Sequence, residues 1–225
     1  MKKRIKIDSA ILSFIIILTG VLYQFRDRIY PSDVGIDNIF DFWGLFIVLS
    51  GTFLRMIARG YKKANSKSGH ELVAKGPYTI TRNPMYLGSF LMGAGFILIV
   101  WPWWSLPVFG ILFYLRFRPQ ILREEGFLKE TFGKSYVEYT RKVARLFPNI
   151  KSLKNARFQH TFPREFLWTT KERWGLLGWP LLAVLLESFQ EKIVFGATDL
   201  SQTLYIFIMA AVVFTVTLAG IYKYA

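Results

Sequence analysis

Two polar segments of the sequence carry side chains that could do chemistry. The first runs from His70 to Tyr86, includes Arg82, and is broken by Gly-Pro and Asn-Pro pairs that disfavour a continuous helix. The second contains the adjacent carboxylates Glu124 and Glu125. Polar groups at membrane depth cost several kcal/mol each unless they are paired. Because both segments border long apolar stretches, this much polarity indicates a site for a polar ligand.

A simpler interpretation stays open beside this one. Arg82 and the neighbouring basic residues would then contact only lipid phosphates, and the two glutamates would form ion pairs with Arg118, Arg123 or Lys129. Small residues near Ser89 and Gly93 are equally ambiguous, because they allow either close helix packing or space for a ligand.

Long uncharged segments surround the polar ones. Apolar residues make up 52% of the chain although it carries 29 Lys and Arg, so the charges are segregated from the apolar runs. A transmembrane helix needs roughly 17–25 mainly apolar residues, and Pro102 and Pro107 divide one overlong run into a hairpin. The sequence therefore predicts an all-α, polytopic membrane protein of about six transmembrane helices, with short interfacial amphipathic helices on the cytoplasmic side. The expected spans are 9–25, 40–58, 84–101, 104–118, 174–193 and 201–222.

The polar segments are placed between these spans. Residues 72–82 should form irregular backbone at the membrane face, with Pro84 in the first turn of the next span. Residues 119–145 should form two interfacial helices separated at Gly133. Residues 1–150 would then form the core that carries the site, and residues 151–225 a basic linker followed by a C-terminal pair of spans.

Charge placement predicts the orientation. With the N-terminus inside, 26 of the 29 Lys and Arg fall in cytoplasmic segments, which satisfies the positive-inside rule. Both termini and the site are therefore expected on the cytoplasmic side, and the N-terminal run is interpreted as an uncleaved signal anchor. The net charge of +14 indicates contact with anionic lipid headgroups and no nucleic-acid partner. The chain has no cysteine, which excludes disulfides and thiolate zinc sites.

The order of the motifs resembles a known superfamily. The pattern His70-Glu-Leu-Val-Ala-Lys-Gly-Pro-Tyr78-Thr-Ile-Thr-Arg82-Asn-Pro-Met-Tyr86-Leu-Gly88 is followed by Glu124-Glu125-x-x-Leu128-x-x-x-Phe-Gly133-x-x-Tyr136-x-x-Tyr139 and then Arg145-x-x-Pro148. Together these are similar to the isoprenylcysteine carboxyl methyltransferase and phospholipid methyltransferase superfamily of integral membrane enzymes, over roughly residues 42–150. The resemblance implies S-adenosylmethionine as cofactor, bound without a Rossmann domain.

The resemblance also implies roles for particular residues. Glu124 would hold the ammonium or ribose hydroxyls of the cofactor, Glu125 would be a general base for an amine or hydroxyl acceptor, and Arg82 is a second catalytic candidate. No metal is expected. The implied cofactor-binding residues are His70, Leu72, Val73, Tyr78, Asn83, Pro84, Met85, Tyr86 and Glu124.

The sequence departs from the superfamily at two positions. Asn83 replaces a histidine, and an amide cannot carry a proton near neutral pH. Gln120 stands where the prenylcysteine enzymes have an arginine linked to the substrate. Arg118 is the candidate that would replace this arginine, with Arg116 and Arg123 as alternatives.

The expected function is therefore S-adenosylmethionine-dependent methyl transfer to a lipophilic, membrane-resident acceptor, through a carboxylate, amine or hydroxyl of a prenyl or lipid compound. Two alternatives stay open. One is an NADPH-dependent sterol-type reductase, whose family shares an Arg-x-Pro-x-Tyr-like block, and the other is a non-catalytic lipid-binding or transport-associated membrane protein.

Overall fold

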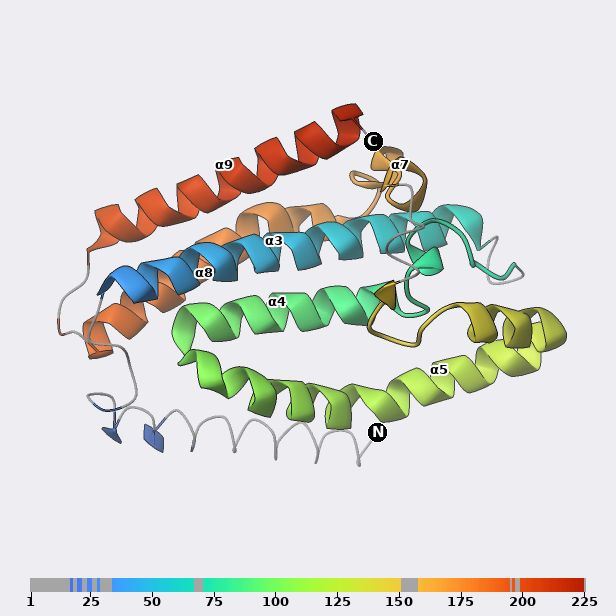
Figure 1. Ribbon diagram of the computed structural model, residues 1–225, viewed down its shortest axis with the longest axis horizontal. Coiled ribbons are helices and arrows are strands. Elements are labelled where there is room, and N and C mark those ends of the chain that lie inside the picture. Colours follow the sequence, from blue (N-terminus) through green and yellow to red (C-terminus); the bar gives the residue numbers. More distant parts are fainter. Residues whose placement is uncertain are drawn as a thin grey trace.

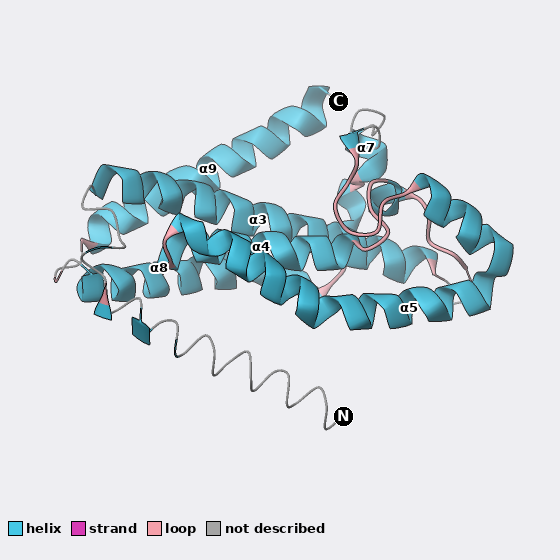
Figure 2. Ribbon diagram, turned by 60° about the horizontal axis from the view of Figure 1, so that its bottom comes forward, coloured by secondary structure: helices cyan, strands magenta, loops and turns pink. Residues whose placement is uncertain are grey.

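The structure is a computed structural model that describes residues 34–66, 71–150, 158–194 and 199–224, with Gly196 and a few positions between 17 and 28. No strand occurs in these ranges, so the predicted all-α class is confirmed for the part of the chain that they cover (Figure 2). The long helices are α3 (Val34–Asn65), α4 (Pro84–Val100), α5 (Leu106–Lys142), α8 (Gly175–Val194) and α9 (Leu200–Tyr224). Short helical turns are η2 (Gly76–Thr79), η3 (Trp103–Ser105), α7 (Phe158–Thr161), η4 (Arg164–Phe166) and η5 (Lys171–Trp174).

Two of the described helices are long and apolar enough to cross a membrane, namely α9 and residues Gly35–Asn65 of α3, while α4 is a shorter apolar helix. Several apolar side chains of α9 face outward, among them Ile208 and Val216, which are 60% and 65% exposed. These features are those of a membrane protein. The first expected span, 9–25, lies almost wholly outside the described residues, and the six-span topology stays a prediction.

Helix α3 is longer than the expected span 40–58. Its 32 residues correspond to about 48 Å at 1.5 Å per residue, well beyond a hydrocarbon core of about 30 Å. The helix continues beyond the expected span through Arg59, Lys62 and Lys63, and the bounds of the span within it stay a prediction. This extension brings the basic end of α3 to the same level as the polar loop that follows it.

Helix α5 also differs from expectation. A span at 104–118 followed by two interfacial helices separated at Gly133 was predicted. One helix continues through Pro119 without the expected boundary after residue 118, whereas the expected break at Gly133 is confirmed, with φ of 52° and ψ of −124° there. Proline removes one bond of the helical ladder, and good helix formers on both sides outweigh that loss here. Beyond Gly133 the chain folds back toward the start of α4 (Figure 1).

The packing of α3 on α4 depends on glycines. A Cβ atom added to Gly51 of α3 would lie 2.5 Å from the carbonyl oxygen of Gly88 on α4, and one added to Gly88 would lie 2.7 Å from the carbonyl oxygen of Gly51. Gly44 and Gly95 form a second close approach two turns away. The packing interpretation of the small residues on α4 is therefore confirmed for Gly88 and Gly95.

The C-terminal helices share one apolar core with α3. Phe207 and Phe214 of α9 and Ala183 of α8 are buried there against α3. At the end of α9, the hydroxyl of Tyr222 donates to the carbonyl oxygen of Phe162, 2.6 Å away, which ties α9 to the segment after α7. Helices α8 and α9 thus pack against α3, whose last turn contains Lys62 and Lys63, and stabilise its position.

Candidate functional site

A cavity of about 710 Å³ lies where α3 ends, α4 begins and α5 approaches its bend. This volume falls within the range of about 300–1,000 Å³ that small-molecule sites occupy. Polar and charged groups line it together with aromatic and aliphatic side chains. The lining comprises Arg55, Lys62, Ser66, Glu71, Leu72, Val73, Tyr78, Arg82, Asn83, Pro84, Met85, Tyr86, Ser89, Phe117, Gln120, Arg123, Glu124, Phe127, Leu128, Phe132, Tyr136 and Tyr139.

The cavity brings together most of the residues singled out from the sequence. Those that line it are Leu72, Val73, Tyr78, Arg82, Asn83, Pro84, Met85, Tyr86 and Glu124. His70 lies outside the described residues, and neither Glu125 nor Arg118 belongs to the lining. Tyr86 of the first motif and Glu124 of the second are 38 positions apart in the chain, so their meeting in one cavity is a property of the fold.

The loop before α4 is clamped between α3 and the end of α5. Gly76 has a φ of 61°, and a Cβ atom there would lie 2.7 Å from the ring of Tyr61, so glycine suits this turn on both counts. The hydroxyl of Tyr78 donates to the carbonyl oxygen of Ala58 at 3.4 Å, and that of Tyr139 donates to the carbonyl oxygen of Tyr78 at 2.7 Å. Burial raises the pKa of both tyrosines above the usual value, which keeps them as neutral donors.

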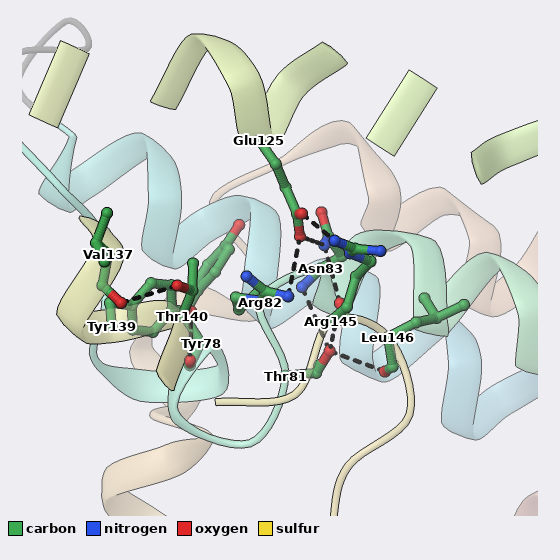
Figure 3. A network of polar contacts seen from close by, with 10 residues as sticks. All are labelled: Tyr78, Thr81, Arg82, Asn83, Glu125, Val137, Tyr139, Thr140, Arg145 and Leu146. Atoms are coloured by element: carbon green, nitrogen blue, oxygen red, sulfur yellow. Dashed lines mark hydrogen bonds and ion pairs between the residues drawn. The ribbon is translucent and has the colours of Figure 1, made fainter. Parts of the chain in front are cut away.

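The third motif docks directly on the first. The backbone N–H of Arg82 donates to the carbonyl oxygen of Ala144 at 2.9 Å, and the Thr81 hydroxyl donates to that of Leu146 at 2.8 Å (Figure 3). The Asn83 amide donates to the carbonyl oxygen of Arg145 at 2.9 Å. Asn83 therefore joins two backbone segments, and Pro84 begins α4 directly after it, as predicted.

Glu125 is held by basic groups beside the cavity. Its carboxylate lies 3.5 Å from Nη2 of Arg82 and 3.0 Å from Nε of Arg145, and it accepts a hydrogen bond of 3.3 Å from the Asn83 amide (Figure 3). The Glu125 side chain is 10% exposed. Burial, followed by the charge of Glu125, raises the pKa of the adjacent Tyr136 to about 12.

This arrangement corrects the expectation for Glu125. A carboxylate engaged by two guanidinium groups and an amide is unsuited to accept a proton from a substrate, and Glu125 is outside the cavity lining. The ion-pair interpretation holds for this residue, although the partners are Arg82 and Arg145 and not the predicted Arg118, Arg123 or Lys129.

Glu124, by contrast, lines the cavity. Its Oε1 accepts hydrogen bonds from the Tyr86 hydroxyl at 2.7 Å and from the Gln120 amide at 3.2 Å. Its Oε2 accepts none from the described side chains. Gln120, which replaces the arginine of the prenylcysteine enzymes, thus orients a carboxylate that retains an oxygen for a ligand.

Arg118, the predicted substrate arginine, does not belong to the lining of this cavity. Arg118 lies over the ring of Tyr114, 5.7 Å from its centroid, and Arg116 lies over the ring of Phe117, so neither lines the cavity. Successive positions on a helix point in different directions, and of the three arginines considered only Arg123 reaches the lining.

A cationic group that the sequence reasoning missed comes from α3. Arg55 donates to the Ser89 hydroxyl and forms two hydrogen bonds with Glu172, 3.0 Å from Nη2 and 3.3 Å from Nε. Burial opposes ionisation of Glu172, but hydrogen bonding and the charges of Arg55 and Arg59 lower its pKa overall. An arginine within the expected span 40–58 was the available signal, because charges in such segments are rare and functional. Ser89 lines the cavity, so the ligand-space interpretation applies to it.

The fold and the cavity are those of a helical membrane protein with a cavity of polar and apolar lining at one end of its helices. Residues 41–135 match the model of the phospholipid methyltransferase family, which confirms the resemblance carried by the motifs.

Curated relatives agree with this assignment. The chain is 34% identical over 115 residues to a protein-S-isoprenylcysteine O-methyltransferase of Saccharomyces cerevisiae, covering 48% of each chain. It is 31% identical over 109 residues to the B form from Arabidopsis thaliana, covering 45% of this chain and 55% of the relative. The match to the Xenopus laevis enzyme is 34% over 119 residues, or 49% and 41%. The chain thus spans about half the length of these relatives, and no solved structure matches it.

Proposed function

We propose that this protein transfers a methyl group from S-adenosylmethionine to a lipid-like acceptor that resides in the membrane. The observation that carries the proposal is that residues of the first two motifs, Tyr86 and Glu124 among them, line one cavity together with apolar side chains. The relatives that this chain matches over about half of their length are named isoprenylcysteine O-methyltransferases, which supports this class of reaction.

The residues present fit this cofactor. Glu124 retains a carboxylate oxygen for an ammonium or ribose hydroxyl, and Nε of Arg82 is buried without a hydrogen-bond partner among the described residues, which suits a carboxylate. Tyr86 adds an aromatic face for adenine or for cation–π attraction to the sulfonium. When bound, S-adenosylmethionine supplies an electrophilic methyl group whose transfer neutralises the sulfonium.

The protein's contribution to catalysis is alignment and exclusion of water. The anchored loop and Glu124 hold the donor side of the cavity in one geometry, which raises the effective concentration of the reacting groups. Glu124 and Arg82 would hold S-adenosylmethionine so that its methyl group is aligned with the acceptor. Arg82 and Arg145 form ion pairs with Glu125, so this carboxylate does not serve as a general base. A carboxylate acceptor, which needs no base, therefore fits this site better than an amine or hydroxyl acceptor.

The acceptor is proposed to enter sideways from the bilayer. Met85, Phe117, Phe127 and Leu128 form an apolar part of the lining, while Arg55 and Arg123 supply positive charge for an anionic headgroup. We further propose the six-span topology with the cavity and both termini at the cytoplasmic face, as the distribution of basic residues indicates. The cofactor would then come from the cytoplasm.

Calorimetry and acceptor length test this function. Purified protein in detergent should bind S-adenosylmethionine at micromolar level and should not bind NADPH. Methyl incorporation into prenylated carboxylates in micelles should rise with chain length, since each buried methylene contributes about 0.8 kcal/mol. Absence of S-adenosylmethionine binding up to millimolar ligand would refute the methyltransferase, whereas equal kcat/KM for short and long acceptors would refute only the lipid acceptor.

A further inference from the structure

A group of buried carboxylates lies at the opposite end of the helices from the cavity. Asp37 and Asp41 are one turn apart near the start of α3, and Glu187 faces them from the last half of α8. One oxygen from each residue lies within 4.8 Å of the others. Asp41 is 2% exposed and Glu187 is fully buried, so bulk water does not solvate these two carboxylates.

A fourth oxygen points to a ligand independently of the carboxylates. The amide oxygen of Gln190, one turn beyond Glu187 on α8, is buried and has no hydrogen-bond partner within the described ranges. Both carboxylate oxygens of Glu187 and one of Asp41 are likewise buried and accept no hydrogen bond from a donor within the described ranges. Gln190 and Asp37 line one cavity of about 410 Å³, so the amide and one carboxylate of the group share that cavity.

Burying several carboxylates without positive charge costs several kcal/mol per ion. No ion pair links Asp37, Asp41 or Glu187 to a basic side chain of the described residues; Arg28 lines the same cavity without forming one. The free energy of this arrangement is therefore lowered by a bound cation or by shared protons. An array of only carboxylate and amide oxygens is the donor set that hard cations prefer.

We propose that Asp37, Asp41, Glu187 and Gln190 form a cation site that takes Ca²⁺. Oxygens bound to Ca²⁺ at 2.3–2.6 Å stand up to about 5 Å apart across the ion, against about 4.2 Å for Mg²⁺. The carboxylate oxygens all lie within 4.8 Å of one another, so they fit around one ion of the larger sphere without movement of the helices. The bound ion links the start of α3 to the end of α8 and stabilises their contact, a structural role separate from methyl transfer.

Terbium luminescence and thermal unfolding test the site on the full-length protein in detergent after treatment with EDTA. Trp101 and Trp103 line the adjoining cavity, so Tb³⁺ bound at the carboxylates should be sensitised by tryptophan. Its luminescence should saturate at one equivalent of Tb³⁺ per protein and should be lost when Ca²⁺ displaces the ion. Ca²⁺ at a hundredfold excess over its Kd should raise the Tm by roughly 5–10 °C, from the linkage relation and the size scaling of Tm. Mg²⁺ should have a smaller effect.

The double substitution Asp41→Asn with Glu187→Gln keeps side-chain volume and should abolish both the luminescence and the Ca²⁺-dependent shift in Tm. Glu130→Gln, which changes an exposed carboxylate of α5, is the control and should retain them. S-adenosylmethionine binding should be unchanged in both variants. Wild-type protein without Ca²⁺-dependent luminescence or Tm shift would show that protons neutralise the group, and a Ca²⁺ response that survives in the double variant would place the ion elsewhere. Either result overturns the proposal.

Discussion

Glu124 and Glu125 are neighbours on α5, yet their side chains have different surroundings. With 3.6 residues per turn, consecutive positions on a helix point about 100° apart. Glu124 therefore faces the cavity beside Tyr86, and Glu125 faces the guanidinium groups of Arg82 and Arg145. The pair provides matched variants for separating ligand binding from stability.

Glu124→Gln should weaken S-adenosylmethionine binding by about 30-fold or more, since a desolvated charge pair with the cofactor ammonium is worth about 2–4 kcal/mol. The Tm of the protein without ligand should change little, because Oε1 keeps its neighbours in this isosteric variant. Calorimetry and thermal unfolding measure the two effects. Normal binding with a much lower Tm would make Glu124 a structural residue.

Glu125→Gln should show the reverse behaviour. Removing the negative charge leaves Arg82 and Arg145 without their common partner, at an expected cost of about 2–3 kcal/mol, moderated because the Arg145 side chain is half exposed. Unfolding in denaturant should report the loss, while variants that still fold retain methyl transfer. An unchanged stability with complete loss of activity would restore Glu125 as a catalytic group.

The glycines of α3 and α4 determine how closely these two helices approach. The loop between α3 and α4 is attached to one helix at each end, so this helix contact sets its position. Residues of the loop line the cavity. The polar end of α3 is equally dependent on the C-terminal segment, because Arg55 and Arg59 both pair with Glu172.

Gly51→Ala should destabilise the protein by about 1–3 kcal/mol, because the added methyl group would overlap the Gly88 carbonyl oxygen and force the helices apart. Gly110→Ala is the matched control. It lies in α5 with nothing within 4 Å of the added Cβ, so its stability should be unchanged or higher by up to about 1 kcal/mol. Equal effects of the two substitutions on thermal unfolding would contradict the close-packing account.

At the scale of the whole molecule, the long helices run alternately between a basic end and an acidic end. The end of α3, the start of α4 and the bend of α5 lie at one end of the helices (Figure 1), and residues of these segments line the cavity. The buried carboxylates belong to the start of α3 and the last half of α8, at the other end. This polarity agrees with the orientation inferred from the distribution of Lys and Arg.

Cysteine accessibility measures the orientation in this cysteine-free chain. Lys134→Cys, at the exposed bend of α5, should resist a membrane-impermeant thiol reagent in intact cells and react only after lysis. Lys192→Cys, exposed near the end of α8, should react in intact cells. Gln190, although close by, is too buried to serve as the outer position. Labelling of position 134 from outside would reverse the orientation.

The sequence by itself determined what local chemistry controls. Apolar composition predicted helices, the Gly-Pro and Asn-Pro pairs predicted the irregular loop and the start of α4 at Pro84, and the motifs predicted most of the lining, Glu124 included. Each depends on backbone preferences or on residues a few positions apart.

Tertiary structure decided the partners of those residues. Glu125 meets Arg145 across 20 positions, and Arg55 meets Glu172 across 117, which no periodicity along one helix indicates. The same holds for the length of α3 and for the acidic group shared by α3 and α8, because side-chain contacts between helices depend on how far each helix extends and which face it turns inward. Such contacts are long-range, and their energies act only after the helices have packed.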